Sequence, residues 1–118
     1  MIDLIVIGAG LSGLTAALAA AEAGLRVKVV SKGLNALHWS AATLDLLGYV
    51  PPRATPIREP WATLPRLSLD HPYQVAGAER AAAAIQRFVG WTTAAGLPYV
   101  GGTVEGENFM LPSPVGAM

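Results

Sequence analysis

The sequence contains no cysteine, and this absence narrows its chemistry at once. Disulfide bonds, thiolate catalysis and metal or iron–sulfur sites built on cysteine are excluded. Charge of one sign is not in excess either, since eight Lys and Arg residues balance eight Asp and Glu residues. Without a basic surplus, the chain lacks the electrostatic footprint of a nucleic-acid-binding protein, and we expect no nucleic acid among its partners.

Long hydrophobic runs are also missing. No stretch of about 18 apolar residues is free of glycine and charge, so we expect no direct membrane span. The start of the chain is apolar, but it has no basic segment and Asp3 interrupts it, which argues against a signal peptide. We therefore expect a cytoplasmic protein.

Apolar residues make up 53% of the chain and charged residues only 14%. This composition is apolar for a small free-standing domain, and 118 residues suffice for one domain at most. We therefore expect part of the apolar surface to be covered by a partner or by a second copy of the chain.

Residues 1–33 carry the pattern of a strand–helix–strand unit. Asp3–Ile7 is a continuous apolar run, as in a central parallel strand. Leu11–Ala23 consists of strong helix formers, and Gly24 follows where a left-handed C-cap is favoured. Leu25–Val30 is a second strand. The fold class predicted is α/β, with an incomplete Rossmann-like βαβ domain.

A G-x-G-x-x-G motif joins the first strand to the helix, which is the context that gives this motif its meaning. Its residues are Gly8, Ala9, Gly10, Leu11, Ser12 and Gly13. Gly8 permits the tight turn, Gly10 lets a pyrophosphate approach the backbone, and Gly13 lets the helix pack closely on the strand. The helix N-terminus then supplies N–H donors and a positive potential. We expect a dinucleotide here.

The second strand ends in Ser31 and Lys32, where nucleotide-binding domains of this type commonly place a carboxylate for the adenosine ribose. A serine makes a weaker contact than a carboxylate does. Lys32 suits a 2′-phosphate, which is the NADP alternative, or is simply solvated. Both alternatives stay open from the residues alone.

The rest of the chain offers less regular patterning. We expect a short helix over Ser40–Leu47 with Ser40 as its N-cap. Residues 51–72 hold six prolines and predict an irregular insertion with little room for regular elements. A further helix is predicted over 77–96, ended or weakened by Gly90, and the tail over 97–118 offers two short extended pieces at most.

Several segments resemble known flavoproteins. The opening resembles the FAD-binding start of the family that includes the flavoprotein subunits of fumarate reductase and succinate dehydrogenase. Three later segments resemble the B subunit of anaerobic glycerol-3-phosphate dehydrogenase: KGLNALHWSAATLDLLGY, HPYQVAG and ENFMLPSPVGAM. This resemblance extends over essentially the whole chain, but over only the first third or less of a family member.

The resemblance implies a flavoprotein subunit of a complex that oxidises sn-glycerol 3-phosphate to dihydroxyacetone phosphate. Electrons would pass to the quinone pool through partner subunits, one of them a membrane-associated iron–sulfur protein. Membrane association would then come only through these partners. The resemblance favours FAD as the cofactor and leaves FMN as the alternative, while the catalytic residues stay unknown.

The segment after the second strand supplies the remaining candidate contacts with the flavin. In this topology such segments border the ligand crevice. We therefore expect His38, Trp39, Ser40 and Ala41 to lie near the isoalloxazine ring or the ribityl chain. In the fumarate reductase group a histidine in this region carries covalently attached flavin, whereas a packing or capping role is the alternative for His38. Trp61 and Trp91 are predicted to serve in a core or an interface.

Two strands bury too little apolar surface for a complete sheet of this kind. We therefore expect the chain to be the N-terminal part of a flavin-binding domain, inactive alone and stabilised by self-association or by partner subunits. The alternatives are an NAD(P)-binding module and a non-catalytic fragment that acts only through partner chains.

Overall fold

The computed structural model describes residues 1–33, 36–52, 55–101 and 106–112. The chain divides into two compact units, Met1–Leu44 and Asp45–Met118, and each is described by itself. The assignment of residues 1–118 to one domain stays a prediction, as does the boundary of the βαβ unit at residue 33.

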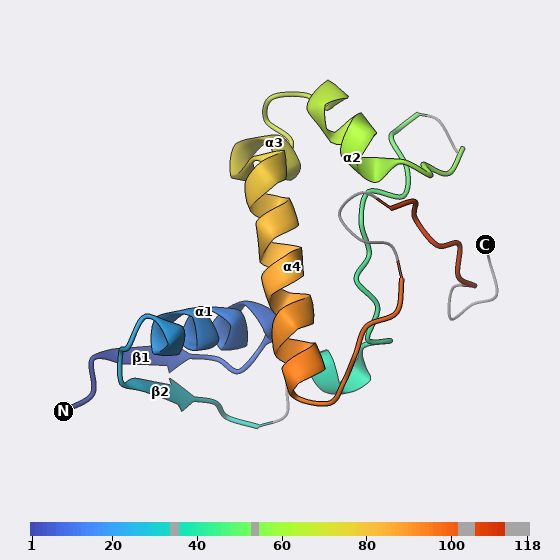
Figure 1. The fold of residues 1–118 in the computed structure, drawn as a ribbon. Helices are drawn as coiled ribbons and strands as arrows, with labels where there is room; N and C mark the ends of the chain where they lie inside the picture. Colours follow the sequence, from blue (N-terminus) through green and yellow to red (C-terminus); the bar gives the residue numbers. More distant parts are fainter. Residues whose placement is uncertain (34–35, 53–54, 102–105, 113–118) are drawn as a thin grey trace. The chain divides into compact units, whose positions relative to one another are not determined.

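The first unit is built on a strand–helix–strand element (Figure 1). β1 comprises Leu4–Ile7, α1 comprises Leu11–Glu22, and β2 comprises Val27–Val30. The two strands are parallel and pair in register along their whole length. The α/β arrangement predicted for this segment is confirmed, although the strands begin one or two residues later than expected.

One face of the β1–β2 pair is covered by α1, as Figure 1 shows. Ala17 is buried on the helix, and burial alternates along β1. Leu4 and Val6 are half-buried, whereas Ile5 is 59% exposed and Ile7 is 88% exposed. Because successive strand residues point to opposite faces, the face turned away from α1 is open, and it carries Ile5, Ile7 and Val30 together with Lys28 beside Ile5.

The end of α1 follows the sequence prediction. Gly24 has a φ of 84°, in the left-handed region that glycine tolerates without strain. Its N–H donates to the carbonyl of Ala21, and the N–H of Leu25 donates to the carbonyl of Ala20. These two bonds form a Schellman motif, which satisfies carbonyls at the helix end and turns the chain toward β2.

An ion pair joins the two strands at their amino ends. The Arg26 guanidinium donates from Nε and Nη2 to the two carboxylate oxygens of Asp3, at 2.8 and 2.9 Å. The backbone N–H of Arg26 donates to the same carboxylate, and the N–H of Asp3 donates to the carbonyl of Arg26. This bidentate arrangement sets the register at the amino ends of β1 and β2.

The pair gives the first unit a defined acid response. Side-chain hydrogen bonding to Arg26 lowers the pKa of Asp3 below its ordinary value of 3.8. A lowered pKa in the folded state stabilises the fold above pH 3.8, and this contribution is lost as the pH falls through the lowered pKa. Asp3→Asn should therefore lower the urea midpoint at pH 7, and its difference from the parent should shrink below pH 3.8. Equal differences at pH 7 and at acidic pH would contradict this assignment.

The segment after β2 departs from the prediction. The helix expected over Ser40–Leu47 was wrong, because the structure has a 3₁₀ helix, η1, over Ala36–Trp39 and no helix over 40–47. The Ser40 hydroxyl accepts from the N–H of Ala42 at 3.3 Å, and Ala42 has a φ of 55°. Ser40 thus closes a turn, and the left-handed backbone at Ala42 cannot continue a right-handed helix.

The second unit begins with short helices in the proline-rich stretch. α2 covers Pro60–Thr63, η2 covers Leu64–Arg66, and α3 covers Pro72–Ala76. Proline lies at the first or second position of each, where its missing N–H costs nothing. The expectation of an irregular stretch was therefore wrong for these short elements. These short helices pack around Leu64, whose side chain is buried at 1% exposure.

The longest helix is α4, over Ala78–Ala94, close to the range predicted. Gly90 lies inside it, so this glycine does not end the helix. Phe88 packs edge-to-face against Tyr99, with ring centroids 5.5 Å apart, and this contact holds the following segment. No helix in the described part of the chain is both long and apolar enough to cross a bilayer.

Asn108 ties the later residues of the second unit to its first loop. Its side-chain amide donates to the carbonyls of Leu47 and Ile57, at 3.0 and 2.9 Å. Its backbone N–H donates to the carbonyl of Arg58. No strand forms over 97–101 or 106–112, and the rest of the tail predicted to be extended lies outside the described residues.

Candidate functional site

The glycine motif and the end of β2 lie at the same edge of the sheet. β1 leads directly into the motif, and the N–H of Gly8 donates to the carbonyl of Val30 at 2.8 Å. This bond extends the strand pairing by one step and brings Gly8 beside the chain that continues to Ser31. In open α/β sheets the carboxyl edge of the strands is where ligands bind.

Two glycines of the motif are explained by the fold itself. Gly8 has a φ of 103°, a conformation that residues with a side chain adopt only under strain. A Cβ at Gly13 would collide with the carbonyl oxygen of Gly8 and lie 3.4 Å from Cγ1 of Val6. Gly13 therefore permits the close packing of α1 on β1, as the sequence predicts.

Gly10 differs from both, because the fold does not require it. Its φ of −74° and ψ of 176° suit any residue, and a Cβ built there meets no atom within 4 Å. The space in front of Gly10 is therefore open. Such an open approach to the backbone is what a pyrophosphate-binding turn requires at this position of the motif.

The start of α1 suits a phosphate. Gly10 is its N-cap and offers no side-chain cap, and no acidic residue lies in the first turn. The positive end of a 12-residue helix is therefore not compensated by a carboxylate of its own. Backbone N–H groups at such an end bind pyrophosphate, with Leu11 and Ser12 as the predicted donors. The residues present thus fit the diphosphate of a dinucleotide.

The end of β2 lacks a carboxylate and is folded back on itself. The Ser31 hydroxyl donates to the carbonyl of Gly33 at 2.9 Å. The N–H of Gly33 donates to the Ser31 hydroxyl oxygen over a longer distance of 3.5 Å. The Ser31 proton is thereby committed, although its oxygen can still accept from a ribose hydroxyl. Lys32 is exposed beside it.

Charge is segregated between the two edges of the first unit. Its two carboxylates belong to Asp3, just before β1, and to Glu22, at the end of α1. Because α1 returns antiparallel to the strands, both lie toward the edge opposite the glycine motif. Among the described residues of this unit, the ligand edge therefore has Lys32 and a positive helix end but no carboxylate.

The four residues predicted to border the flavin lie in η1 and the turn after it. The rings of His38 and Trp39 meet edge-to-face, with centroids 5.3 Å apart, and Trp39 is 86% exposed. Ser40 closes the turn described above, with Ala41 between it and Ala42. An exposed indole is free to contact a ligand, but the flavin contact of these residues stays a prediction.

Sequence reasoning missed the Asp3–Arg26 pair and the charge segregation. The pair was hidden because its members are 23 residues apart and meet only through strand pairing. The alternation of Arg26 and Lys28 with apolar residues was the one local signal. Within the ranges that the structure describes, no three His, Asp or Glu side chains gather to hold a metal ion.

A glycine turn between a parallel strand and a helix, with open space at Gly10, defines a dinucleotide-binding domain of the Rossmann-like α/β class. The comparison with known families agrees with this geometry. The chain belongs to the FAD binding domain family, whose model matches residues 3–118. FAD is accordingly the cofactor that the family indicates, as expected, in preference to FMN.

Curated relatives confirm the second resemblance. The chain is 43% identical over 84 residues to the B subunit of anaerobic glycerol-3-phosphate dehydrogenase from Pectobacterium carotovorum subsp. carotovorum, covering 69% of this chain and 20% of the relative. It is 36% identical over 112 residues to the probable B subunit of this dehydrogenase from Halobacterium salinarum, covering 87% and 26%. For the B subunit from Aliivibrio fischeri, the identity is 33% over 119 residues, covering 98% and 26%. The chain thus spans between 20% and 26% of the length of these relatives. No solved structure matches it significantly.

Proposed function

We propose that this chain is the FAD-binding portion of an oxidoreductase subunit, within a complex that oxidises glycerol 3-phosphate and passes electrons toward quinone. The main observation in support of this binding site is the open space in front of Gly10 at the start of α1. The similarity to the B subunit of the dehydrogenase supports the complex and its substrate. On this proposal the chain is not active alone.

Each part of the ligand has its own segment of the chain. The pyrophosphate lies over Gly8 to Gly13, held by backbone N–H groups near Leu11 and Ser12. Ser31 and Lys32 meet the adenosine ribose. When bound, FAD supplies the electron-transfer chemistry, while these residues hold and orient it.

The remaining parts of the proposal concern partners and domain organisation. Residues 45–118 form an insertion and the helix α4 within the same flavin-binding domain, whose sheet is incomplete with two strands. The apolar face that exposes Ile5 and Ile7 is covered by another subunit of the complex or by self-association. The location is cytoplasmic, and attachment to a membrane comes only through partner subunits.

Titration of the purified chain with FAD, FMN and NADP⁺ tests the cofactor. FAD should bind most tightly, because it alone combines the diphosphate with the flavin. Isothermal calorimetry gives the three dissociation constants under one set of conditions. Tighter binding of NADP⁺ than of FAD would replace the proposal with the NAD(P)-binding module, and no binding of any of the three would leave a non-catalytic fragment.

Tryptophan fluorescence tests the flavin side of the site. The chain has three tryptophans, at positions 39, 61 and 91, and only Trp39 lies in the first unit. In single-tryptophan variants, saturating FAD should quench Trp39 more than Trp61 or Trp91, because the proposal places the flavin beside Trp39 and assigns neither of the others to the site. Equal quenching of all three would contradict the placement of His38, Trp39, Ser40 and Ala41.

Release of the flavin upon denaturation tests whether His38 is attached to it covalently. The proposal is that FAD is held without a covalent bond, so acid precipitation should leave all flavin in the supernatant. Flavin retained on the protein in the parent but not in a His38→Gln variant would establish covalent attachment instead.

A further inference from the structure

The ribose end of the site differs from the arrangement that excludes phosphorylated nucleotides. A carboxylate at the end of the second strand accepts a hydrogen bond from the ribose 2′-hydroxyl and repels a 2′-phosphate. A nearby cation accommodates a 2′-phosphate. Here β2 ends at Val30 and is followed by Ser31 and the exposed Lys32. We infer that the ribose subsite of this chain accepts a 2′-phosphate, so that an adenine dinucleotide phosphorylated at that position binds in preference to its unphosphorylated form.

Ser31 is small and neutral, so it does not repel a 2′-phosphate as a carboxylate would. Its proton is committed to the carbonyl of Gly33, so the phosphate would be held by Lys32 and not by this hydroxyl. A Cβ built at Gly33 meets no atom of the described residues within 4 Å. An additional phosphate therefore meets no obstruction from these described residues at the strand end.

The electrostatics of the first unit point the same way. Both of its carboxylates, Asp3 and Glu22, lie toward the opposite edge, and Asp3 is already paired with Arg26. The ligand edge combines the positive end of α1 with the ammonium group of Lys32. An additional negative charge on the ligand is therefore stabilised by Lys32, without a like charge from the described residues of this unit to oppose it.

The inference rests on the proposed dinucleotide site and is tested by displacement of FAD from the full chain. NAD⁺ and NADP⁺ are the probes, because they differ only in the 2′-phosphate. NADP⁺ should displace FAD at a concentration up to about fivefold lower than NAD⁺, the upper end of what one exposed ion pair contributes. The ratio should approach one at about 0.5 M salt, since exposed pairs are screened.

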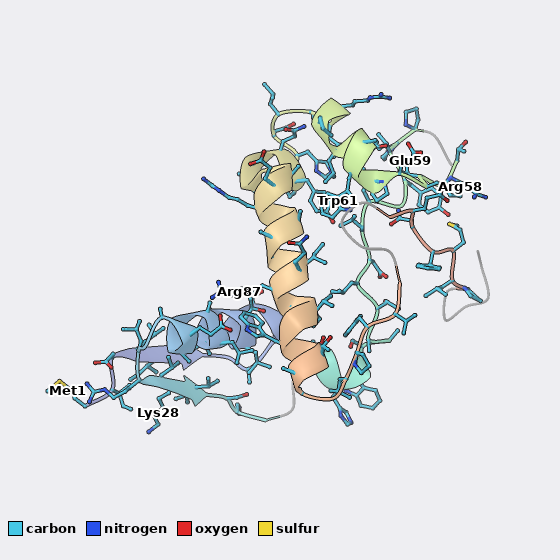
Figure 2. All side chains as sticks on the ribbon, viewed as in Figure 1. Met1, Lys28, Arg58, Glu59, Trp61 and Arg87 are labelled. Carbon is cyan, nitrogen blue, oxygen red and sulfur yellow. The ribbon has the colours of Figure 1, made fainter. Side chains whose placement is uncertain are left out.

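Three variants assign the effect to the strand end. Lys32→Ala should make NAD⁺ and NADP⁺ displace FAD equally. Ser31→Glu should reverse the preference toward NAD⁺, because a carboxylate repels the 2′-phosphate and accepts a hydrogen bond from the 2′-hydroxyl. The matched control is Lys28→Ala, which removes the same charge from β2, four residues before Lys32 (Figure 2); it should leave the preference for NADP⁺ unchanged.

The outcomes separate this inference from the proposed function. If FAD binds but NAD⁺ and NADP⁺ displace it equally in the parent, the inference is overturned and the FAD site stands. Loss of the preference in Lys28→Ala as much as in Lys32→Ala would also overturn it, because the effect would then be one of net charge. Direct calorimetry with NADP⁺ and NAD⁺ covers the case in which FAD does not bind: a retained preference for NADP⁺ then supports the subsite, and no binding of either overturns both proposals.

Discussion

Replacement of Gly10 by valine should weaken FAD binding by at least about a hundredfold while the helical content of the chain stays the same. The side chain would occupy the open space in front of the first turn of α1, where the proposal places the pyrophosphate. It meets no protein atom within 4 Å of its Cβ, and the backbone at Gly10 suits any residue. Valine is a poorer N-cap than glycine, but the packing of α1 on the strands is unchanged, so the helix should still form. Calorimetric titration with FAD and far-ultraviolet circular dichroism measure the two effects.

Gly90→Val is the matched control, because a Cβ at Gly90 also meets no atom within 4 Å. Gly90 lies in α4, outside the segments to which the proposal assigns the ligand, so this variant should bind FAD with the affinity of the parent. Equal affinity of Gly10→Val and the parent would show that the ligand does not pass over Gly10, and the site would have to be assigned elsewhere.

Gly13→Ala should destabilise the first unit by about 3 kcal/mol, the upper part of the range for an overpacked contact. The new methyl group would collide with the carbonyl oxygen of Gly8, a backbone atom that cannot rotate away. The sign of the effect is informative, because glycine to alanine inside a helix otherwise stabilises by about 1 kcal/mol. Urea unfolding followed by circular dichroism measures the change.

Gly90→Ala serves as the reference for this prediction, since Gly90 is also a helical glycine but has free space around it. It should raise the unfolding midpoint, whereas Gly13→Ala should lower it. A rise in both would mean that α1 does not pack on Gly8 as described.

The strand–helix–strand element could be predicted because its signals are local. An apolar run, a helix-forming segment and a terminal glycine each specify their own element, and the ends were placed within one or two residues. The helix expected over Ser40–Leu47 failed for a local reason that the sequence does not reveal, the left-handed backbone at Ala42. In the proline-rich stretch, the prolines begin short helices as well as interrupting the chain.

The candidate site was predictable in part for a similar reason. The G-x-G-x-x-G spacing identified the segment, but only the three-dimensional surroundings separate Gly10 from Gly8 and Gly13 by what each position requires. The charge segregation depends on the return of α1 past the strands, which places Glu22 and Asp3 toward the same edge. Such long-range placement is not written in any short stretch of residues.

The hydrogen bond between Gly8 and Val30 has a consequence for cooperativity. It joins the turn that would hold the phosphates to the last residue of β2, so that opening the turn and separating the strand ends share one bond. A ligand that binds only the closed turn adds its binding free energy to the pairing of β1 with β2 by mass action. With two short strands and few buried residues, local opening is easy. Occupancy of the site would then stabilise the pairing of the two strands. The amide hydrogens at the strand ends would exchange more slowly as the ligand concentration rises.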